Sequence, residues 1–350
     1  MKRILALCLV FMLSLSLVTP AAAGTEGPVT GRFGTSAVPT VNSIAVYTDA
    51  ALTSPATSLT PQQTYWIKVS VTDNDGIGNL SYLYTHLWYD SDGGAPVWAG
   101  RGAGNLPASS MGYTFMNTAG TWSEGYAGGT TWEFTLVSAP TAAQSADINV
   151  TTFDFVYSVK IGKIAAETVT SPEKWQVMAY AYDAQAQTAE LGYQSGGVYG
   201  LPMNWYGEVI VPTSYTVDWG IVPAGMNFNS VSAVESITGG VTYIANGNWV
   251  GQFKAATSWT NGGSQTFTLS AAPTTVNTFA LKGFPGSLSD PVNAGTMFDA
   301  AGGYVLETTG VSGTPEAGWN LPQYLYLKIS PTVTNGGYFT GAITYGIRND

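Results

Sequence analysis

Short stretches of alternating apolar and polar residues recur along this chain, separated by turns rich in Gly, Pro, Asn and Asp. In residues 66–72, for example, Ile67, Val69 and Val71 alternate with polar side chains. A period of two places successive side chains on opposite faces of a strand, so the pattern predicts strands with one buried face. Long helices need many Leu, Glu, Lys and Arg residues, and this chain contains few of them. We therefore expect an all-β protein.

The spacing of these stretches predicts two β-sandwich domains in tandem, Ig-like or jelly-roll-like in character. In the first half, strands are expected at 44–47, 66–72, 82–89, 131–137, 153–161 and 174–182, with Trp175, Val177, Ala179 and Ala181 on one face of the last. In the second half they are expected at 214–219, 241–245, 249–254, 265–270, 278–282, 324–330 and 338–347. Two short helices are expected, at 141–147 and 184–190.

The N-terminus has the organisation of a secretory signal peptide over residues 1–23. Lys2 and Arg3 precede an apolar stretch at 4–18, and small residues at 21–23 form a cleavage site. Cys8 lies within this segment and is the single cysteine, so the mature chain is expected to be exported without disulfides. No second apolar stretch of membrane length follows, so no membrane span is expected after cleavage.

The predicted domain organisation follows from changes in composition. Residues 24–40 are interpreted as a flexible leader, with a donor strand for a neighbouring subunit as the alternative. The first domain is expected at 41–193, with a Gly-rich aromatic insertion at 95–126. A linker at 194–205 then leads to the second domain at 206–350.

The charge balance excludes some partners. The chain has 12 Lys and Arg against 22 Asp and Glu, a formal net charge of −10, and only 10% of its residues are charged. Nucleic acids and anionic lipid surfaces both select basic proteins. A surface built mainly from uncharged polar residues suits adhesion, glycan contact or lateral packing between proteins.

Two groups of residues are candidate binding sites. Asp73, Asp75 and Asn79 lie in one short turn and could offer oxygen ligands to Ca²⁺, the one possible cofactor; self-capping of the turn is the alternative. In the insertion, Trp98, Tyr113, Trp122 and Tyr126 could stack on sugars of a cell-wall or extracellular glycan. Packing of these aromatic rings onto the first domain is the alternative reading.

Catalytic chemistry finds little support in the sequence. His86 is the single histidine, on the same strand face as Tyr82, Tyr84 and Trp88, and is expected to be structural. Glu124, Glu133 and Asp154 could serve a polysaccharide hydrolase only if two of them lie at working separation. The chain is therefore not expected to be an enzyme.

Sequence patterns in both halves resemble those of known surface proteins. The stretches 69–76 and 175–183 resemble Ig-like modules of exported prokaryotic surface proteins. In the second half, Trp219-Gly220, Asn248-Trp249, residues 325–331 and residues 337–345 occur in an order similar to the C-terminal domains of WxL-type cell-wall-binding proteins and of archaeal surface proteins. Where that family has Trp-x-Leu, this chain has Trp249-Val250-Gly251. The resemblance implies the fold.

Together these features predict a secreted, cell-surface-associated structural protein. Its expected mode of action is self-association, or packing against other surface proteins, in a surface layer, filament or wall. The alternative is a carbohydrate-binding adhesin that uses the aromatic insertion, and a secreted polysaccharide hydrolase ranks third.

Overall fold

The computed structural model describes residues 37–91, 93–96, 110–116, 121–123, 131–169, 172–213, 216–310 and 317–350. Over these residues the protein is mainly β, as predicted, and its strands form several antiparallel sheets with one short parallel pairing. In the described residues one short α-helix is found, α2 (Ala142–Ala146), within the predicted range. Thr141 caps it by accepting a hydrogen bond from the Gln144 backbone in a capping box. No helix in these parts of the chain is long and apolar enough to cross a membrane.

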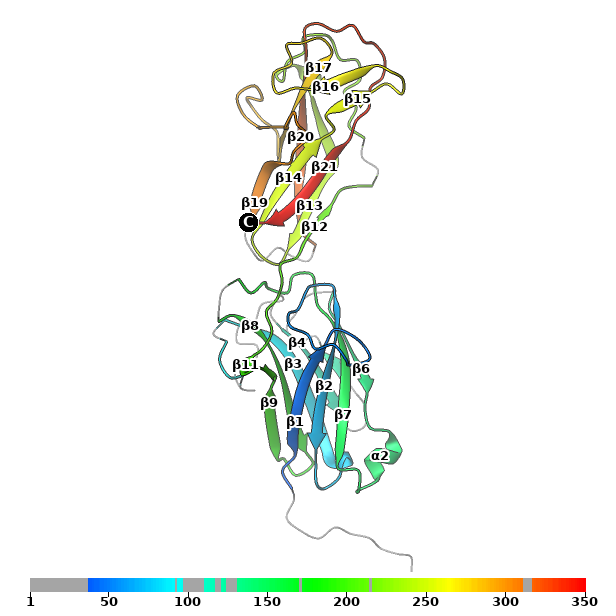
Figure 1. Cartoon of the computed structure of the whole chain (residues 1–350), viewed down its shortest axis with the longest axis vertical. Helices are drawn as coiled ribbons and strands as arrows, with labels where there is room; N and C mark the ends of the chain where they lie inside the picture. The colour runs from blue at the N-terminus through cyan, green and yellow to red at the C-terminus, as the bar shows by residue number, and fades with distance from the viewer. Residues whose placement is uncertain are drawn as a thin grey trace, which may run out of the picture. The chain divides into compact units, whose positions relative to one another are not determined.

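Strands of the first half form two main sheets. The first has the order β1-β2-β7-β6, comprising β1 (Thr40–Tyr47), β2 (Thr64–Thr72), β7 (Thr152–Lys160) and β6 (Glu133–Ser138). The second has the order β5-β4-β3-β8-β9, comprising β5 (Thr121–Ser123), β4 (Ser110–Met116), β3 (Leu80–Asp90), β8 (Lys174–Asp183) and β9 (Thr188–Gly192). The short 3-10 helix η1 (Ile77–Asn79) leads into β3, and the strands β10 (Gln194–Ser195) and β11 (Val198–Tyr199) form a small hairpin. Figure 1 shows β1, β2 and β7 side by side.

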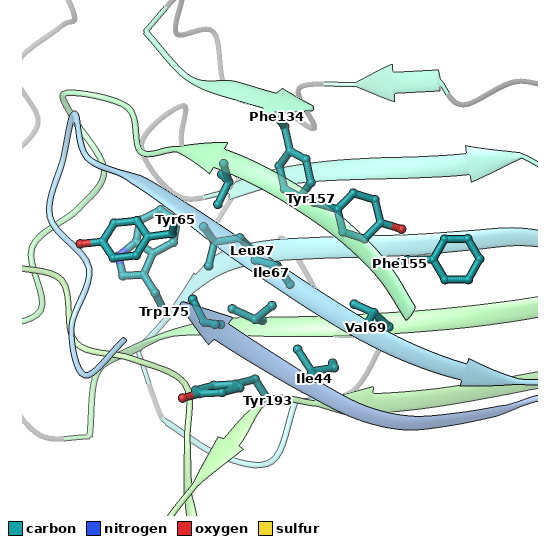
Figure 2. Packing of buried hydrophobic residues seen from close by; sticks show 14 of the residues in the cluster. Ile44, Tyr65, Ile67, Val69, Leu87, Phe134, Phe155, Tyr157, Trp175 and Tyr193 are labelled. Carbon is teal, nitrogen blue, oxygen red and sulfur yellow. The ribbon is translucent and has the colours of Figure 1, made fainter. Parts of the chain in front are cut away.

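Apolar side chains from both of these sheets share one hydrophobic core. Ile67 and Val69 of β2 and Tyr157 of β7 are buried in it together with Leu87 of β3 and Trp175 of β8 (Figure 2). The alternation predicted for 66–72 and for 175–181 is confirmed, because the apolar members of both series are buried. Burial of one face of each sheet is the main stabilising contribution to this half.

The second half forms a large and a small sheet. The large sheet has the order β12-β13-β20-β17-β16-β15, comprising β12 (Gly207–Ile210), β13 (Val234–Ala245), β20 (Trp319–Ile329), β17 (Thr278–Phe284), β16 (Thr266–Leu269) and β15 (Ser258–Thr260), with β18 (Thr296–Met297) also on β17. The small sheet has the order β19-β14-β21, comprising β19 (Val305–Gly310), β14 (Trp249–Ala255) and β21 (Ile343–Asn349). The 3-10 helix η3 (Val231–Ala233) precedes β13.

A second hydrophobic core is built from aromatic residues of both these sheets. Tyr243 of β13 stacks on Trp249 of β14, with ring centroids 4.9 Å apart. Phe253 lies four residues after Trp249 on β14, and its ring centroid is 4.2 Å from that of Phe298. Such aromatic contacts add specific geometry to the burial of apolar area.

The structure overturns two predicted elements. Residues 184–190 are not a helix: 184–187 form a turn, and 188–190 are the start of β9, because the Asp183 carboxylate accepts hydrogen bonds from the backbone N–H groups of Gln185 and Gln187. Residues 216–219 of the predicted strand 214–219 are irregular, and there Asp218 accepts a hydrogen bond from the Gly220 backbone. The predicted strand 338–347 begins at Ile343.

Candidate functional site

Exposed aliphatic side chains lie on strands at the edges of three sheets. Val137 of β6 is 57% exposed, Ile210 of β12 is 44% exposed and Leu306 of β19 is 54% exposed. Each strand ends its sheet in the described strand order, so one of its two backbone edges faces away from the sheet. None of the three strands contains a lysine or an arginine. Edge strands of soluble proteins are commonly protected by charged side chains, lysine above all, and each of these three carries a single glutamate instead.

A cleft of about 960 Å³ lies in the second half, between residues 216–222 and residues 335–343. Its described lining contains aromatic, aliphatic and glycine residues together with the polar Thr216, Asn335 and Thr340, and Asp218 is its one carboxylate. Ile221 and Tyr338 are exposed at this cleft. The cleft thus presents aromatic and aliphatic surface beside a few polar side chains.

Three stacked aromatic rings form part of the cleft lining. Trp219 stacks on Trp259 at 5.8 Å, and Trp259 packs on Phe279 at 4.4 Å, both measured between ring centroids. The Trp219 indole donates a hydrogen bond of 3.0 Å to the Ala233 carbonyl, which fixes its orientation. The Trp259 Nε1 is buried without a partner in the described structure.

Gly341 lies against the indole of Trp259 and closes one side of the stack. A Cβ added at Gly341 would stand 1.8 Å from Trp259 Cδ1. The residue before it, Thr340, exchanges backbone hydrogen bonds with Thr260 of β15, so this segment is held against the end of the large sheet. Only glycine permits so close an approach of backbone to ring.

The predicted calcium residues are brought together by the structure. Asp73 is fully buried, and its carboxylate accepts hydrogen bonds from the Asp75 backbone at 2.8 Å and from the Asn79 side chain at 3.2 Å. Burial, the largest cause, and the nearby Asp75 and Asp183 raise the pKa of the Asp73 carboxyl. Within the described residues, no group of three or more His, Cys, Asp or Glu side chains is placed to hold a metal ion. Calcium binding stays a prediction.

Sequence reasoning missed the contribution of Asp183 to this region. It is fully buried at the end of β8, close enough to Asp73 to affect its pKa. The signal in the sequence was the spacing Asp183, Gln185 and Gln187 after an alternating strand, which is typical of a carboxylate that caps its own turn.

The glycan residues predicted in the insertion lie largely outside the described part of the chain. Trp98 and Tyr126 are outside it. Tyr113 and Trp122 are paired in backbone register between β4 and β5, but their side chains are outside the described structure. This site therefore stays a prediction.

The carboxylates considered for hydrolysis are far apart where the structure describes them. Glu133 of β6 bonds to Lys160 at 2.9 Å, and Asp154 of β7 bonds to Lys68 at 3.3 Å. Glu133 is opposite Lys160, six residues along β7 from Asp154, which corresponds to roughly 20 Å of strand. Glycosidase carboxylates lie within about 10 Å of one another, so these two are not such a pair. Glu124 lies outside the described residues.

His86 is buried on the sheet face that it was predicted to share with Trp88, with ring centroids 5.6 Å apart.

A different ionisable group, Glu307 of β19, is buried in the second core. Sequence reasoning missed it because 305–310 has the polar composition of a loop.

Comparisons with known proteins place the chain in no characterised family. No family model matches it, and no curated protein matches it. Among solved structures, the chain is similar to the C-terminal domain of the AgI/II polypeptide BspA of Streptococcus agalactiae, with 11% sequence identity and a TM-score of 0.23. The alignment covers 89% of this chain and 96% of that domain.

Proposed function

We propose that this chain is an exported, non-enzymatic component of a cell surface that acts by packing against other copies of itself. In this proposal its two halves are tandem β-sandwich domains. The observation that carries the proposal is the exposed aliphatic residue on each of three edge strands without lysine or arginine, Val137 on β6, Ile210 on β12 and Leu306 on β19.

Edge strands give a physical route to assembly. An edge strand presents backbone N–H and C=O groups that are not paired within its sheet. A strand of another copy can form hydrogen bonds with these groups, and the side chains between the two strands then lose contact with water. Each copy has a formal net charge of −10, so approaching copies repel one another and assembly should be favoured by salt, which screens this repulsion. The cleft adds apolar surface, because Ile221 and Tyr338 are exposed there.

The test is the assembly state of the chain from Gly24 to Asp350 and of edge variants. Negative-stain electron microscopy and sedimentation velocity should show filaments, sheets or large oligomers for the natural sequence. Val137→Lys, Ile210→Lys and Leu306→Lys, combined in one chain, should yield monomers, since a lysine on an edge strand opposes pairing.

A matched control separates the edge effect from a general effect of added charge. Val231 is 96% exposed and lies in η3, outside the sheets, so Val231→Lys should leave assembly unchanged. Monomers of the natural chain at every protein concentration, with and without calcium, would overturn the proposal. If Val231→Lys loses assembly as fully as the triple edge variant, the edge strands have no specific role in assembly.

A further inference from the structure

Four tyrosine side chains form a continuous platform on one face of the β5-β4-β3-β8-β9 sheet. They are Tyr82 and Tyr84 of β3 and Tyr180 and Tyr182 of β8. In the antiparallel register Tyr82 lies opposite Tyr182, and Tyr84 lies opposite Tyr180. All four are partly exposed, whereas Leu83 and Ala181, the residues between them on these strands, are buried in the first core.

The rings of this tyrosine platform are close and evenly spaced. Centroids of Tyr82 and Tyr84 lie 5.9 Å apart with the rings nearly parallel, at 22°. Tyr82 and Tyr182 lie 5.8 Å apart, and Tyr84 and Tyr180 lie 6.1 Å apart. The rigid sheet behind them holds the rings in place, so little conformational entropy is lost when a ligand lies on them.

The charge around the platform selects the kind of ligand. On the neighbouring strand β9, Thr188 lies opposite Tyr182 and the exposed Glu190 lies opposite Tyr180. On β3, β8 and β9 the described residues around the platform thus offer phenols, a hydroxyl and one carboxylate, and no lysine or arginine lies opposite the four tyrosines on β8 or β9. An anionic polymer would meet Glu190 and a chain of formal net charge −10, whereas a neutral ligand would meet no repulsion.

We propose that this platform binds a neutral polysaccharide by stacking sugar rings on the tyrosine faces. The apolar face of a pyranose ring packs on an aromatic face, while the phenolic hydroxyls and Glu190 exchange hydrogen bonds with sugar hydroxyls. A protein partner fits less well, because the exposed aliphatic residues of the described first-half strands, Val137 of β6 and Val198 of β11, lie outside this face. This inference uses residues other than those of the proposed edge contacts and stands independently of them.

The experiment is affinity electrophoresis of the full chain, purified after export, in gels that contain hydroxyethyl cellulose, glycol chitin or dextran as neutral probes and polygalacturonate as an anionic one. The natural chain should be retarded by at least one neutral probe and not by polygalacturonate. Tyr82→Ala with Tyr182→Ala should weaken retardation about tenfold or more, as expected from the loss of two stacking rings.

Conservative and remote variants make the result specific. Tyr82→Phe with Tyr182→Phe keeps the rings and should retain binding within about threefold. Tyr304→Ala removes an exposed tyrosine of the second half that lies outside the cleft and should have no effect. If the double alanine variant does not fold by circular dichroism, the same comparison is made with Tyr180→Ser against Tyr180→Phe. No retardation of the natural chain by any neutral probe, or equal retardation of the folded alanine or serine variants, would overturn the proposal.

Discussion

Tyr243 of β13 donates a hydrogen bond to the carboxyl group of Glu307 of β19 inside the second core. Burial raises the pKa of both groups, and the Glu307 carboxylate raises that of Tyr243 further. The Glu307 carboxyl group is therefore held in an apolar environment that disfavours its charged form.

This pair makes the stability of the protein depend on pH. The pKa of Glu307 in the folded state lies above its ordinary value of 4.5. As pH rises above 4.5, the unfolded chain loses this proton first, so the stability that Glu307 contributes falls until the folded-state carboxyl also ionises. Glu307→Gln removes this titration. We expect the melting temperature of the variant, relative to the natural chain, to rise with pH in that window. Calorimetry at several pH values measures it.

A variant of Glu235, a partly exposed residue of β13, is the control for that experiment. Glu235→Gln shows how much of any change comes from replacing a carboxylate that lies outside the second core. A constant difference between Glu307→Gln and the natural chain across the window would show that Glu307 ionises normally in the folded protein.

Adding a methyl group at Gly341 should disturb the cleft. The added Cβ would collide with Trp259, so we expect Gly341→Ala to lower the free energy of unfolding by about 1–3 kcal/mol. Gly336 also lines the cleft, but nothing lies within 4 Å of a Cβ there, and Gly336→Ala should be neutral. Chemical denaturation followed by tryptophan fluorescence distinguishes the two. Equal stability of both variants would refute the close packing on Trp259.

Lys282 of β17 should hold a surface loop in place. Its ammonium group donates hydrogen bonds to the carbonyl groups of Pro291, Val292 and Ala294, at 3.0, 2.6 and 3.0 Å. We expect Lys282→Met to cost about 2 kcal/mol, because hydrogen bonds from a charged donor are the stronger ones. Hydrogen exchange should be faster at 290–295 in this variant. In Lys328→Met, a change of a partly exposed lysine on β20, exchange in that loop should stay as in the natural chain.

The turn after β8 should depend on Asp183. Its buried carboxylate accepts two backbone hydrogen bonds, at 2.9 and 2.7 Å, so we expect Asp183→Ala to destabilise the chain by about 3 kcal/mol. Asp147 caps an exposed turn in a similar way, and Asp147→Ala should cost about 0.5 kcal/mol. Thermal unfolding of the two variants gives the comparison. If Asp183→Ala loses no more stability than Asp147→Ala, the buried Asp183 carboxylate contributes no more to stability than the one that caps the exposed turn.

The sequence predicted most central strands and the edge strands β1 and β6, but it missed other edges. The alternation visible at 66–72 reflects one buried face of β2. In β8 the apolar series seen at 174–182 is buried, and Gln176 and Met178 of the opposite face are buried as well. The short edge strands β12 and β19 were not predicted, because pairing on one side suffices to form them and their composition resembles that of loops. The Ala- and Gln-rich composition of residues 184–190 predicted a helix. The hydrogen bonds that Asp183 accepts from the following backbone stabilise a turn instead.

Candidate sites were harder to predict than strands. Tyr82 and Tyr84 alternate in the sequence, as do Tyr180 and Tyr182, but only the pairing of β3 with β8 makes them one surface. Likewise, Trp219, Trp259 and Phe279 give no local sign of stacking. Local patterns report on which face a residue occupies, whereas a site depends on contacts between distant segments.

The pairing of strands also sets an order in which the chain can fold as it is made. Every residue of the first core lies before Asn204, so this core can close while the rest is still being synthesised. In the second half, β13 pairs with β20 and β14 pairs with β21, so the backbones of β13 and β14 find these partner strands only when nearly the whole chain is present. Such distant pairings fold slowly. During synthesis, the aromatic strands of the second half are therefore exposed to chaperones and to one another until their partner strands have been made.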